Sequence, residues 1–232
     1  MRETAAFDAC ATTYDAALNR GISISGESKE YFVRRRIEWL SFRLRQQAYR
    51  PGRALDYGCG TGGSARALLE HLAVVSVTGV DVSSESIDIA RSQHAQGNVQ
   101  FSTLDEWQPA GQYDLAYCNG VFHHIEPALR DRALASISRA LSAGGYFAFW
   151  ENNPWNPGTR LVMRRIPFDR DAKMLSAPHA RRLLEGAGFE IISTDFLFVF
   201  PRALAALRPL EPALTPVPAG AQYMVLCRRR RA

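Results

Sequence analysis

Hydrophobic residues recur along this chain with two different periods, one typical of helices and the other of strands. Residues 27–49 carry apolar side chains every three or four positions, which predicts an amphipathic helix. The stripe consists of Val33, Ile37, Leu40, Leu44 and Ala48. Pro51 and Gly52 interrupt this pattern, and short apolar segments bounded by Gly, Pro or Asn follow. Such segments predict strands, so the chain switches to an alternation of strands and helices.

The predicted elements define the fold class. In order they are helices 3–19 and 27–49, strand 53–58, helix 63–72, strand 74–81, helix 84–95, strand 98–103, strand 112–118, helix 128–142, strand 146–151, helix 177–186, strand 188–199 and strand 221–227. Right-handed crossovers place helices on both faces of a parallel sheet. No helix follows the final strand, and only the 201–219 connection leads to it, so we expect it to run antiparallel at an edge. The prediction is an α/β, Rossmann-like, mostly parallel sheet of seven strands with the last reversed.

Length and composition are consistent with a single domain over residues 1–232. Its parts are a helical cap (1–50), a core (51–152), and segments (153–232) that include two stretches expected beside the carboxyl ends of the strands. The 47% of hydrophobic residues suffice for a core. Apolar runs such as 146–150 are far too short to cross a membrane. The first residues carry acids where a secretion signal needs basic and apolar residues, so we expect a cytoplasmic protein.

Charge and cysteine usage exclude several classes of function. The formal net charge is +5, and Arg228 to Arg231 supply four of the positive charges. The rest of the chain is nearly neutral, which disfavours nucleic acid as a partner, because nucleic-acid binders spread basic residues over a face. The four cysteines are scattered without a CxxC pair. This spacing indicates neither a zinc knuckle nor a disulfide framework.

The strongest motif is LDYGCGTGG at residues 55–63, which follows the first strand and opens a helix. Glycines there permit a tight turn and a close approach of a ligand to the main chain. Gly58, Gly60 and Gly63 also satisfy the dinucleotide pattern G-x-G-x-x-G. Asp56, however, would lie at the mouth of the turn and repel a pyrophosphate. This acid favours a ligand with positive charge.

Two further acids follow the next two strands. Asp81 ends the second strand, where a carboxylate can accept hydrogen bonds from both hydroxyls of a ribose. Asp105 follows the third strand and is placed to accept a hydrogen bond from an adenine amino group. Together with Asp56, they indicate a site for a cationic nucleoside without phosphate.

These motifs, with YDLAYCNGVFHHI (113–125) and ALSAGGYFAF (140–149), resemble class I S-adenosylmethionine-dependent methyltransferases of the small-molecule type, closely over residues 50–152. The resemblance implies S-adenosylmethionine as cofactor, bound by the core. The implied cofactor contacts are Asp56, Gly58, Cys59 and Gly60 for the methionine part, Asp81 and Val82 for the ribose, Leu104 and Asp105 for the adenine, and Asn119 and Tyr14 near the methionine end. An alternative for Tyr14 is a core aromatic that fixes the first helix.

Catalysis by methyl transfer needs positioning of the acceptor and, for a hydroxyl, a base. His123 and His124 follow the fourth strand and Glu151 ends the fifth. In the sugar and natural-product O-methyltransferases that the chain resembles, a histidine and an acid at these places share the base role, so we expect His123 or His124 with Glu151. Alternatively, one histidine is a hydrogen-bonded core residue. The remaining histidines have no acidic or cysteine partner at ligand spacing, so no metal site is predicted.

Two segments allow more than one interpretation. Residues 152–155 read NNPW, which resembles the motif of nucleic-acid amino-methyltransferases but follows the fifth strand instead of the fourth. We assign it to the acceptor pocket or to a structural turn. Residues 196–214 mix aromatics, leucines and arginines. They are expected to form an apolar lid, to join Arg228 to Arg231 in a patch for an anionic membrane surface, or to pack leucines on the core.

The function that these features favour is O-methylation of a hydroxyl on a small, hydrophobic acceptor: a natural product of secondary metabolism, a lipid or a sugar-like molecule. The alternatives are C- or N-methylation of a small molecule, an RNA or DNA methyltransferase, an NAD-dependent oxidoreductase, and a binding protein without catalysis. Asp56 and the absence of a catalytic Tyr-x-x-x-Lys motif disfavour the oxidoreductase.

Overall fold

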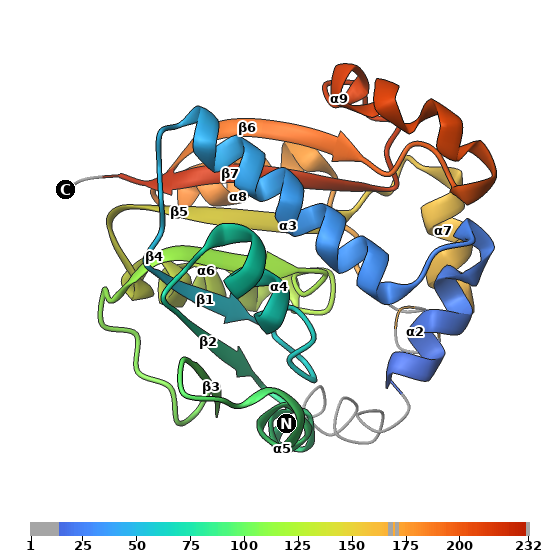
Figure 1. The fold of residues 1–232 in the computed structure, drawn as a ribbon. Coiled ribbons are helices and arrows are strands. Elements are labelled where there is room, and N and C mark those ends of the chain that lie inside the picture. The colour runs from blue at the N-terminus through green and yellow to red at the C-terminus, as the bar shows by residue number, and fades with distance from the viewer. Residues whose placement is uncertain (1–13, 167–168, 170–171, 231–232) are drawn as a thin grey trace.

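The computed structural model describes residues 14–166, 169 and 172–230, with side chains from Leu18 onward. A seven-stranded sheet carries helices on both faces (Figure 1). The strands are β1 (Arg53–Tyr57), β2 (Ser76–Asp81), β3 (Val99–Thr103), β4 (Tyr113–Asn119), β5 (Leu141–Asn152), β6 (Phe189–Leu197) and β7 (Gln222–Arg229). The helices are α2 (Tyr14–Ile22), η1 (Ser23–Ser25), α3 (Lys29–Gln46), α4 (Ala65–Leu72), α5 (Ser84–His94), η2 (Pro127–Leu129), α6 (Arg130–Ala140), α7 (Pro157–Arg165), α8 (Ala177–Gly186), η4 (Arg202–Leu210) and α9 (Glu211–Leu214).

The strand order is β3-β2-β1-β4-β5-β7-β6. Strands β1 to β5 pair in parallel, whereas β7 is antiparallel to both of its neighbours. The predicted Rossmann-like sheet with a reversed last strand is therefore confirmed. The predicted edge position of that strand is wrong, because β7 lies between β5 and β6. Its central residues 223–227 are completely buried, as expected for a strand that is covered on both faces and paired on both sides.

Side chains alternate between two cores, one on each face of the sheet. In β4, Leu115 and Tyr117 pack under α3, α4 and α5, whereas Ala116 and Cys118 pack under α6 and α8. This period of two, with apolar residues on both faces, is typical of strands covered by helices on both sides.

Helix boundaries differ from the sequence prediction in two places. Helix α3 begins after Ser28, whose hydroxyl accepts a hydrogen bond from the Tyr31 amide, and it ends before the exposed Ala48. Ala48 adopts a φ of 51°, so it terminates the helix and does not extend the apolar stripe. Residues 141–145 belong to β5 and not to the preceding helix, which ends at Ala140. Of the helix predicted over 3–19, the structure describes only the part from Tyr14.

The carboxyl ends of β1, β2, β4 and β5 share one edge of the sheet, and α2, α7 and η4 lie beyond that edge (Figure 1). The described parts of 152–176 and of 201–219, the two stretches expected beside the carboxyl ends of the strands, thus contribute to this edge. Such an edge is where open α/β sheets bind ligands. None of the described helices is long and apolar enough to span a membrane.

The two basic and apolar segments near the C-terminus do not form one patch. Arg228 lies opposite Tyr146, at the end of the sheet away from η4, and forms an ion pair with Glu190 at 2.7 Å. Arg228 therefore does not share a patch with η4, and Arg231 of the predicted patch lies outside the described residues. The alternative in which leucines of η4 pack on the core is also wrong, because Leu204, Leu207 and Leu210 are 47, 41 and 57% exposed.

Candidate active site

The glycine turn after β1 is built for close approach by a ligand. Gly58, Gly60 and Gly62 all have positive φ angles, which only glycine adopts without strain. A Cβ on Gly58 would lie 2.3 Å from the Val121 side chain. At Gly60 no heavy atom lies within 4 Å of where a Cβ would stand. The turn is therefore packed against Val121 at Gly58 and open at Gly60.

Asp56 is a buried carboxyl without a complete set of partners. Its side chain is 2% exposed, and its Oδ2 makes no hydrogen bond with any described residue. Burial and, to a smaller extent, the nearby Asp81 raise its pKa, Arg36 opposes both effects, and the resulting pKa is about 7. Positive charge brought close to this carboxyl would stabilise its ionised form.

Asp81 joins the end of β2 to the glycine turn. Its Oδ2 accepts a hydrogen bond from the Gly60 amide at 2.8 Å, and its Oδ1 accepts one from the Ser83 amide at 3.0 Å. Val82 beside it is 43% exposed and can cover a ligand. This carboxylate orders the loop as well as offering oxygen atoms to a ribose.

The remaining predicted cofactor residues occupy the same edge. The Leu104 amide donates to the Asp81 carbonyl at 2.9 Å, and Asp105 is exposed. Cys59 is buried in the turn, which raises its thiol pKa well above the usual value. Asn119 ends β4, and its buried Oδ1 has no hydrogen-bond partner among the described residues. Tyr14 begins α2, and its side chain lies outside the described part.

Together these residues fit S-adenosylmethionine. Two buried oxygen atoms, on Asp56 and Asn119, have no partner in the described chain, and the space around Gly60 is open. A ligand with a cationic methionine part and a neutral ribose would satisfy the oxygen atoms without placing phosphate beside a carboxylate.

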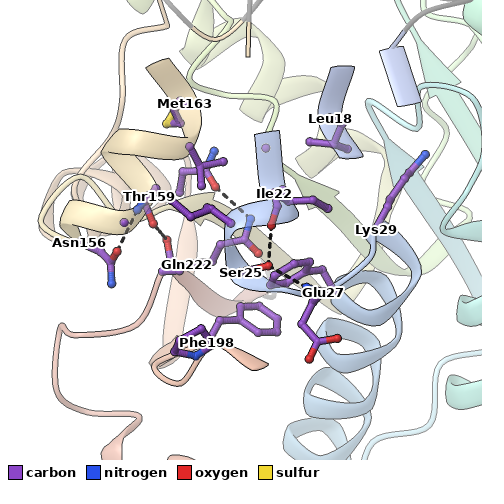
Figure 2. Close-up of a pocket in the computed structure, with 18 of the residues that line it drawn as sticks. Leu18, Ile22, Ser25, Glu27, Lys29, Asn156, Thr159, Met163, Phe198 and Gln222 are labelled. Atoms are coloured by element: carbon purple, nitrogen blue, oxygen red, sulfur yellow. Dashed lines mark hydrogen bonds between the residues drawn. The ribbon is translucent and has the colours of Figure 1, made fainter. Parts of the chain in front are cut away.

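A cavity of about 350 Å³ adjoins this edge. It is bounded by Leu18 and Ile22 of α2 on one side and by Thr159 and Met163 of α7 on the other, with Phe198 below (Figure 2). Its wall is mostly apolar, with polar side chains both at the strand ends and on η1, α3 and η4. Asn119 and Gly120 line it too, so the cavity meets the cofactor edge at the end of β4.

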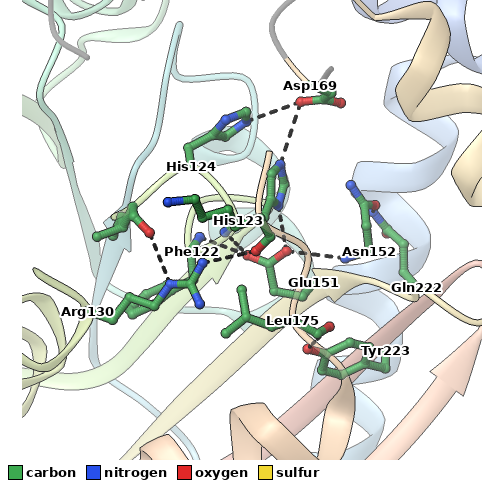
Figure 3. Close-up of polar contacts among 12 residues, drawn as sticks. Phe122, His123, His124, Arg130, Glu151, Asn152, Asp169, Leu175, Gln222 and Tyr223 are labelled. Atoms are coloured by element: carbon green, nitrogen blue, oxygen red, sulfur yellow. Dashed lines mark hydrogen bonds and ion pairs between the residues drawn. The ribbon is translucent and has the colours of Figure 1, made fainter. Parts of the chain in front are cut away.

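His123 lines this cavity, and the buried Glu151 lies behind it and pairs with it (Figure 3). The His123 Nδ1 lies 2.6 Å from the Glu151 Oε2. The Glu151 Oε1 accepts from the Phe122 amide at 2.8 Å and from the His123 amide at 3.3 Å. The Asn152 amide donates to Oε2 at 3.3 Å. Because β4 and β5 are neighbours, their ends bring this histidine and this acid together, as the sequence predicts.

His124 and Asp169 complete the polar wall. The Asp169 Oδ1 lies 3.2 Å from the His124 Nε2 and 3.6 Å from the His123 Nε2. Burial disfavours the His123 imidazolium, but Glu151 and Asp169 outweigh it and raise the pKa to about 10. Burial disfavours the charged form of Asp169 as well, which by itself would raise its pKa. Hydrogen bonds and charge from the two histidines outweigh burial, so the pKa of Asp169 is lowered. Glu151, His123, Asp169 and His124 thus form a row in which carboxylates and imidazoles alternate.

The NNPW segment divides between the two expected roles. Asn152 lines the cavity and accepts a hydrogen bond from Gln222 at 3.0 Å. Asn153 is buried, and its Nδ2 donates to the carbonyls of Pro218 and Gly220, so it holds a turn. Trp155 is 52% exposed.

Several charged residues of the cavity were not predicted from sequence, among them Asp169 and Arg36. Asp169 lies in a segment without periodicity, and nothing in its neighbourhood marks it. Arg36 appears in sequence as one of three consecutive arginines, but its guanidinium is buried and donates to the Tyr117 hydroxyl and the Gln222 side chain. A helix-phase argument could have found it, because Val33, Arg36 and Ile37 share the buried face of α3.

Residues 29–194 match the family described as methyltransferase domain. The chain belongs to this family. Its fold is similar to that of an S-adenosylmethionine-dependent methyltransferase from Mesorhizobium loti, with a TM-score of 0.60, 22% identity, and coverage of 83% of this chain and 98% of the other. A second similar structure is that of a possible histamine N-methyltransferase from Thermotoga maritima. Its TM-score is 0.64 at 20% identity, and the match covers 90% of this chain and 98% of the other. Family and fold imply S-adenosylmethionine as the cofactor.

Curated relatives match over shorter stretches. A trans-aconitate 2-methyltransferase of Rhodopseudomonas palustris (strain BisB5) is 27% identical over 119 residues, which are 51% of this chain and 46% of the relative. A fatty-acid O-methyltransferase of Mycolicibacterium smegmatis is 31% identical over 105 residues, 44% of this chain and 38% of the relative. The chain thus spans less than half the length of these two relatives.

Proposed function

We propose that this protein transfers a methyl group from S-adenosylmethionine to an oxygen of a small, largely apolar acceptor. The observation that carries the proposal is the meeting of the apolar cavity with the cofactor edge at Asn119 and Gly120. A methyl group held there would face an acceptor in the cavity. Transfer is an in-line displacement: the acceptor oxygen forms a bond to the methyl carbon while the carbon–sulfur bond breaks.

In this proposal Asp56 and the Gly58–Gly60 backbone, Cys59 included, hold the cationic methionine part, and Asn119 faces its end. Asp81 binds the ribose, with Val82 beside it, while Leu104 and Asp105 flank the adenine.

We further propose a hydroxyl as the reacting group, with His123 as the base and Glu151 as the residue that orients it. The support is their 2.6 Å contact together with the position of His123 in the cavity wall. The high pKa of His123 in the ligand-free protein means that the imidazole must release a proton before it accepts one from the hydroxyl.

A carboxylate acceptor is the second candidate. The relatives named for trans-aconitate and for fatty acids act, by those names, on molecules that carry carboxylates. The cavity here is lined by the cationic side chains of Arg36 and Arg208 beside its apolar wall. An ionised carboxylate needs no base, so this chemistry would leave His123 with a binding role only.

The test is methylation of paired acceptors, such as a long-chain alcohol and the matching acid, with labelled cofactor. With the alcohol, His123→Ala should reduce turnover by about 10²- to 10⁴-fold while cofactor affinity stays unchanged. With the acid, the same substitution should change turnover little. No transfer to any oxygen acceptor in a broad screen, with transfer to a nitrogen or carbon acceptor, would overturn the proposal.

A further inference from the structure

Three side chains of the acceptor cavity form a compact donor set, the His123–His124–Asp169 cluster, and His124 and Asp169 have no role in the proposed transfer. One nitrogen from each histidine and one oxygen from the aspartate all lie within 4.8 Å of one another. They come from the loop after β4 and from the segment after α7, which the fold brings together at the sheet edge (Figure 3).

The separations suit a metal ion. A first-row divalent ion binds histidine nitrogen and carboxylate oxygen at about 2.0 to 2.2 Å, so its ligand atoms stand about 3 to 4 Å apart. The Asp169 Oδ1 is 3.2 Å from the His124 Nε2 and 3.6 Å from the His123 Nε2. Two of the three separations therefore match already, and small rotations of the side chains would suffice to admit the ion.

The surroundings of His123 provide a second, independent observation. Histidines that bind metals use one ring nitrogen for the ion and donate the other N–H to a carboxylate, which fixes the ring. Here the His123 Nδ1 lies 2.6 Å from Glu151, and Glu151 is itself held by the Phe122 amide. The Nε2 is thereby directed toward Asp169 and the cavity.

We propose that His123, His124 and Asp169 bind one divalent transition-metal ion. Two imidazoles and a carboxylate suit zinc, iron, cobalt or nickel better than magnesium or calcium, which prefer oxygen ligands. All three residues line the cavity, so the ion has coordination positions that face the acceptor. Resting on the proposed function, the acceptor would place its reacting oxygen on the ion, and an acceptor with a second oxygen beside the first would bind as a chelate.

This site changes the role of His123. With an ion on Nε2 the imidazole does not take the hydroxyl proton; the ion makes that hydroxyl more acidic, and the proton leaves to water before the oxygen attacks the methyl group. Loss of His123 should then remove metal and turnover together. A base that works without metal would lose turnover alone.

The experiment titrates Co²⁺, and separately Zn²⁺, into the full chain after removal of metals with a chelator, without cofactor or acceptor. Calorimetry should show one ion per chain, and Co²⁺ should develop visible absorption bands. Asp169→Asn and His124→Asn should each weaken binding by at least about tenfold, and Glu151→Gln by about 10- to 100-fold. His179→Asn, which changes an exposed histidine outside the cluster, should leave binding unchanged. Circular dichroism verifies that each variant is folded.

No binding up to millimolar Co²⁺ would overturn the proposal, as would binding that is weakened equally by His179→Asn. Either result would leave the cluster as an internal ion pair. Because this titration contains neither cofactor nor acceptor, its outcome does not depend on methyl transfer. If the ion binds, a chelator should reduce affinity for an oxygen acceptor and spare that for S-adenosylmethionine; unchanged acceptor affinity would disprove coordination of the acceptor.

Discussion

Two buried carboxyl groups stand at the ends of strands on either side of β4, and their surroundings differ sharply. Asp56, at the end of β1, has an oxygen with no partner among the described residues, and its pKa is raised to about 7. Glu151, at the end of β5, accepts hydrogen bonds from three backbone amides and contacts His123. The hydrogen-bond partners of Asp56 are therefore incomplete in the protein alone, whereas those of Glu151 are complete.

This difference suits Asp56 to binding a ligand and Glu151 to positioning a neighbouring side chain. An unsatisfied buried polar group costs free energy that is recovered when a suitable ligand arrives. In the proposed function, Asp56 would recover this free energy when the cationic part of the cofactor binds. A carboxylate whose oxygen atoms are already bonded gains little from a further partner, so Glu151 instead fixes the loop that carries His123.

The largest expected effect comes from removing the charge of Asp56. Asp56→Asn should weaken binding of S-adenosylmethionine by about 10²- to 10³-fold, because a buried charge pair loses one member. Isothermal calorimetry measures this change, with Asp131→Asn in α6 as a control outside both sites. Equal affinities for the variant and the wild type would show that the cation lies elsewhere.

The matching substitution at Glu151 should act on stability. Glu151→Gln turns one acceptor oxygen into a donor that faces backbone N–H groups, which should lower the free energy of unfolding by about 1 to 3 kcal/mol. Asp56→Asn should do the opposite in the ligand-free protein at pH 8, since it removes a carboxylate that is buried at a cost. Urea unfolding measures the free energy of unfolding of both variants. Changes of the same sign in the two variants would contradict the contrast between Asp56 and Glu151.

The pH dependence of cofactor binding should follow Asp56. The carboxyl must be ionised to attract a cation, so with a pKa of about 7 affinity should rise by about tenfold from pH 6 to pH 8. Folding raises this pKa from 3.8 to about 7, so between pH 3.8 and pH 7 the folded chain binds more protons at Asp56 than the unfolded chain does. The contribution of Asp56 to the free energy of unfolding therefore falls as the pH rises toward 7. Calorimetry between pH 6 and pH 8 should show this rise in cofactor affinity for the wild type and none for Asp56→Asn.

The smallest effect is expected outside both regions. Arg228→Ala removes an exposed ion pair with Glu190, which is worth at most about 1 kcal/mol. Cofactor affinity and turnover should stay at the wild-type level, at low and at moderate salt. A steep salt dependence of activity on RNA, lost in this variant, would favour a nucleic-acid substrate instead.

The sequence predicts those parts of the molecule that depend on strand ends. Asp56, Asp81 and the pair His123 and Glu151 were placed correctly at one edge because successive parallel strands deliver their carboxyl ends there. It could not predict Asp169, since the segment that carries it has no repeat to set its direction. The place of β7 was missed for a related reason: an apolar pattern identifies a strand but does not say which strands pair with it.

The position of β7 has a consequence for the order in which the molecule assembles. Strand β6 pairs only with β7 within the described sheet, and the bond between Arg36 and Gln222 joins residues 186 positions apart. Apart from Tyr14, the residues proposed to bind the cofactor, in contrast, all lie within residues 53–119. Contacts between distant residues form late because closing long loops is costly. We therefore expect pulsed hydrogen exchange to protect β1 and β4 before β6, so that a newly made chain recognises its cofactor before it has a place for the acceptor.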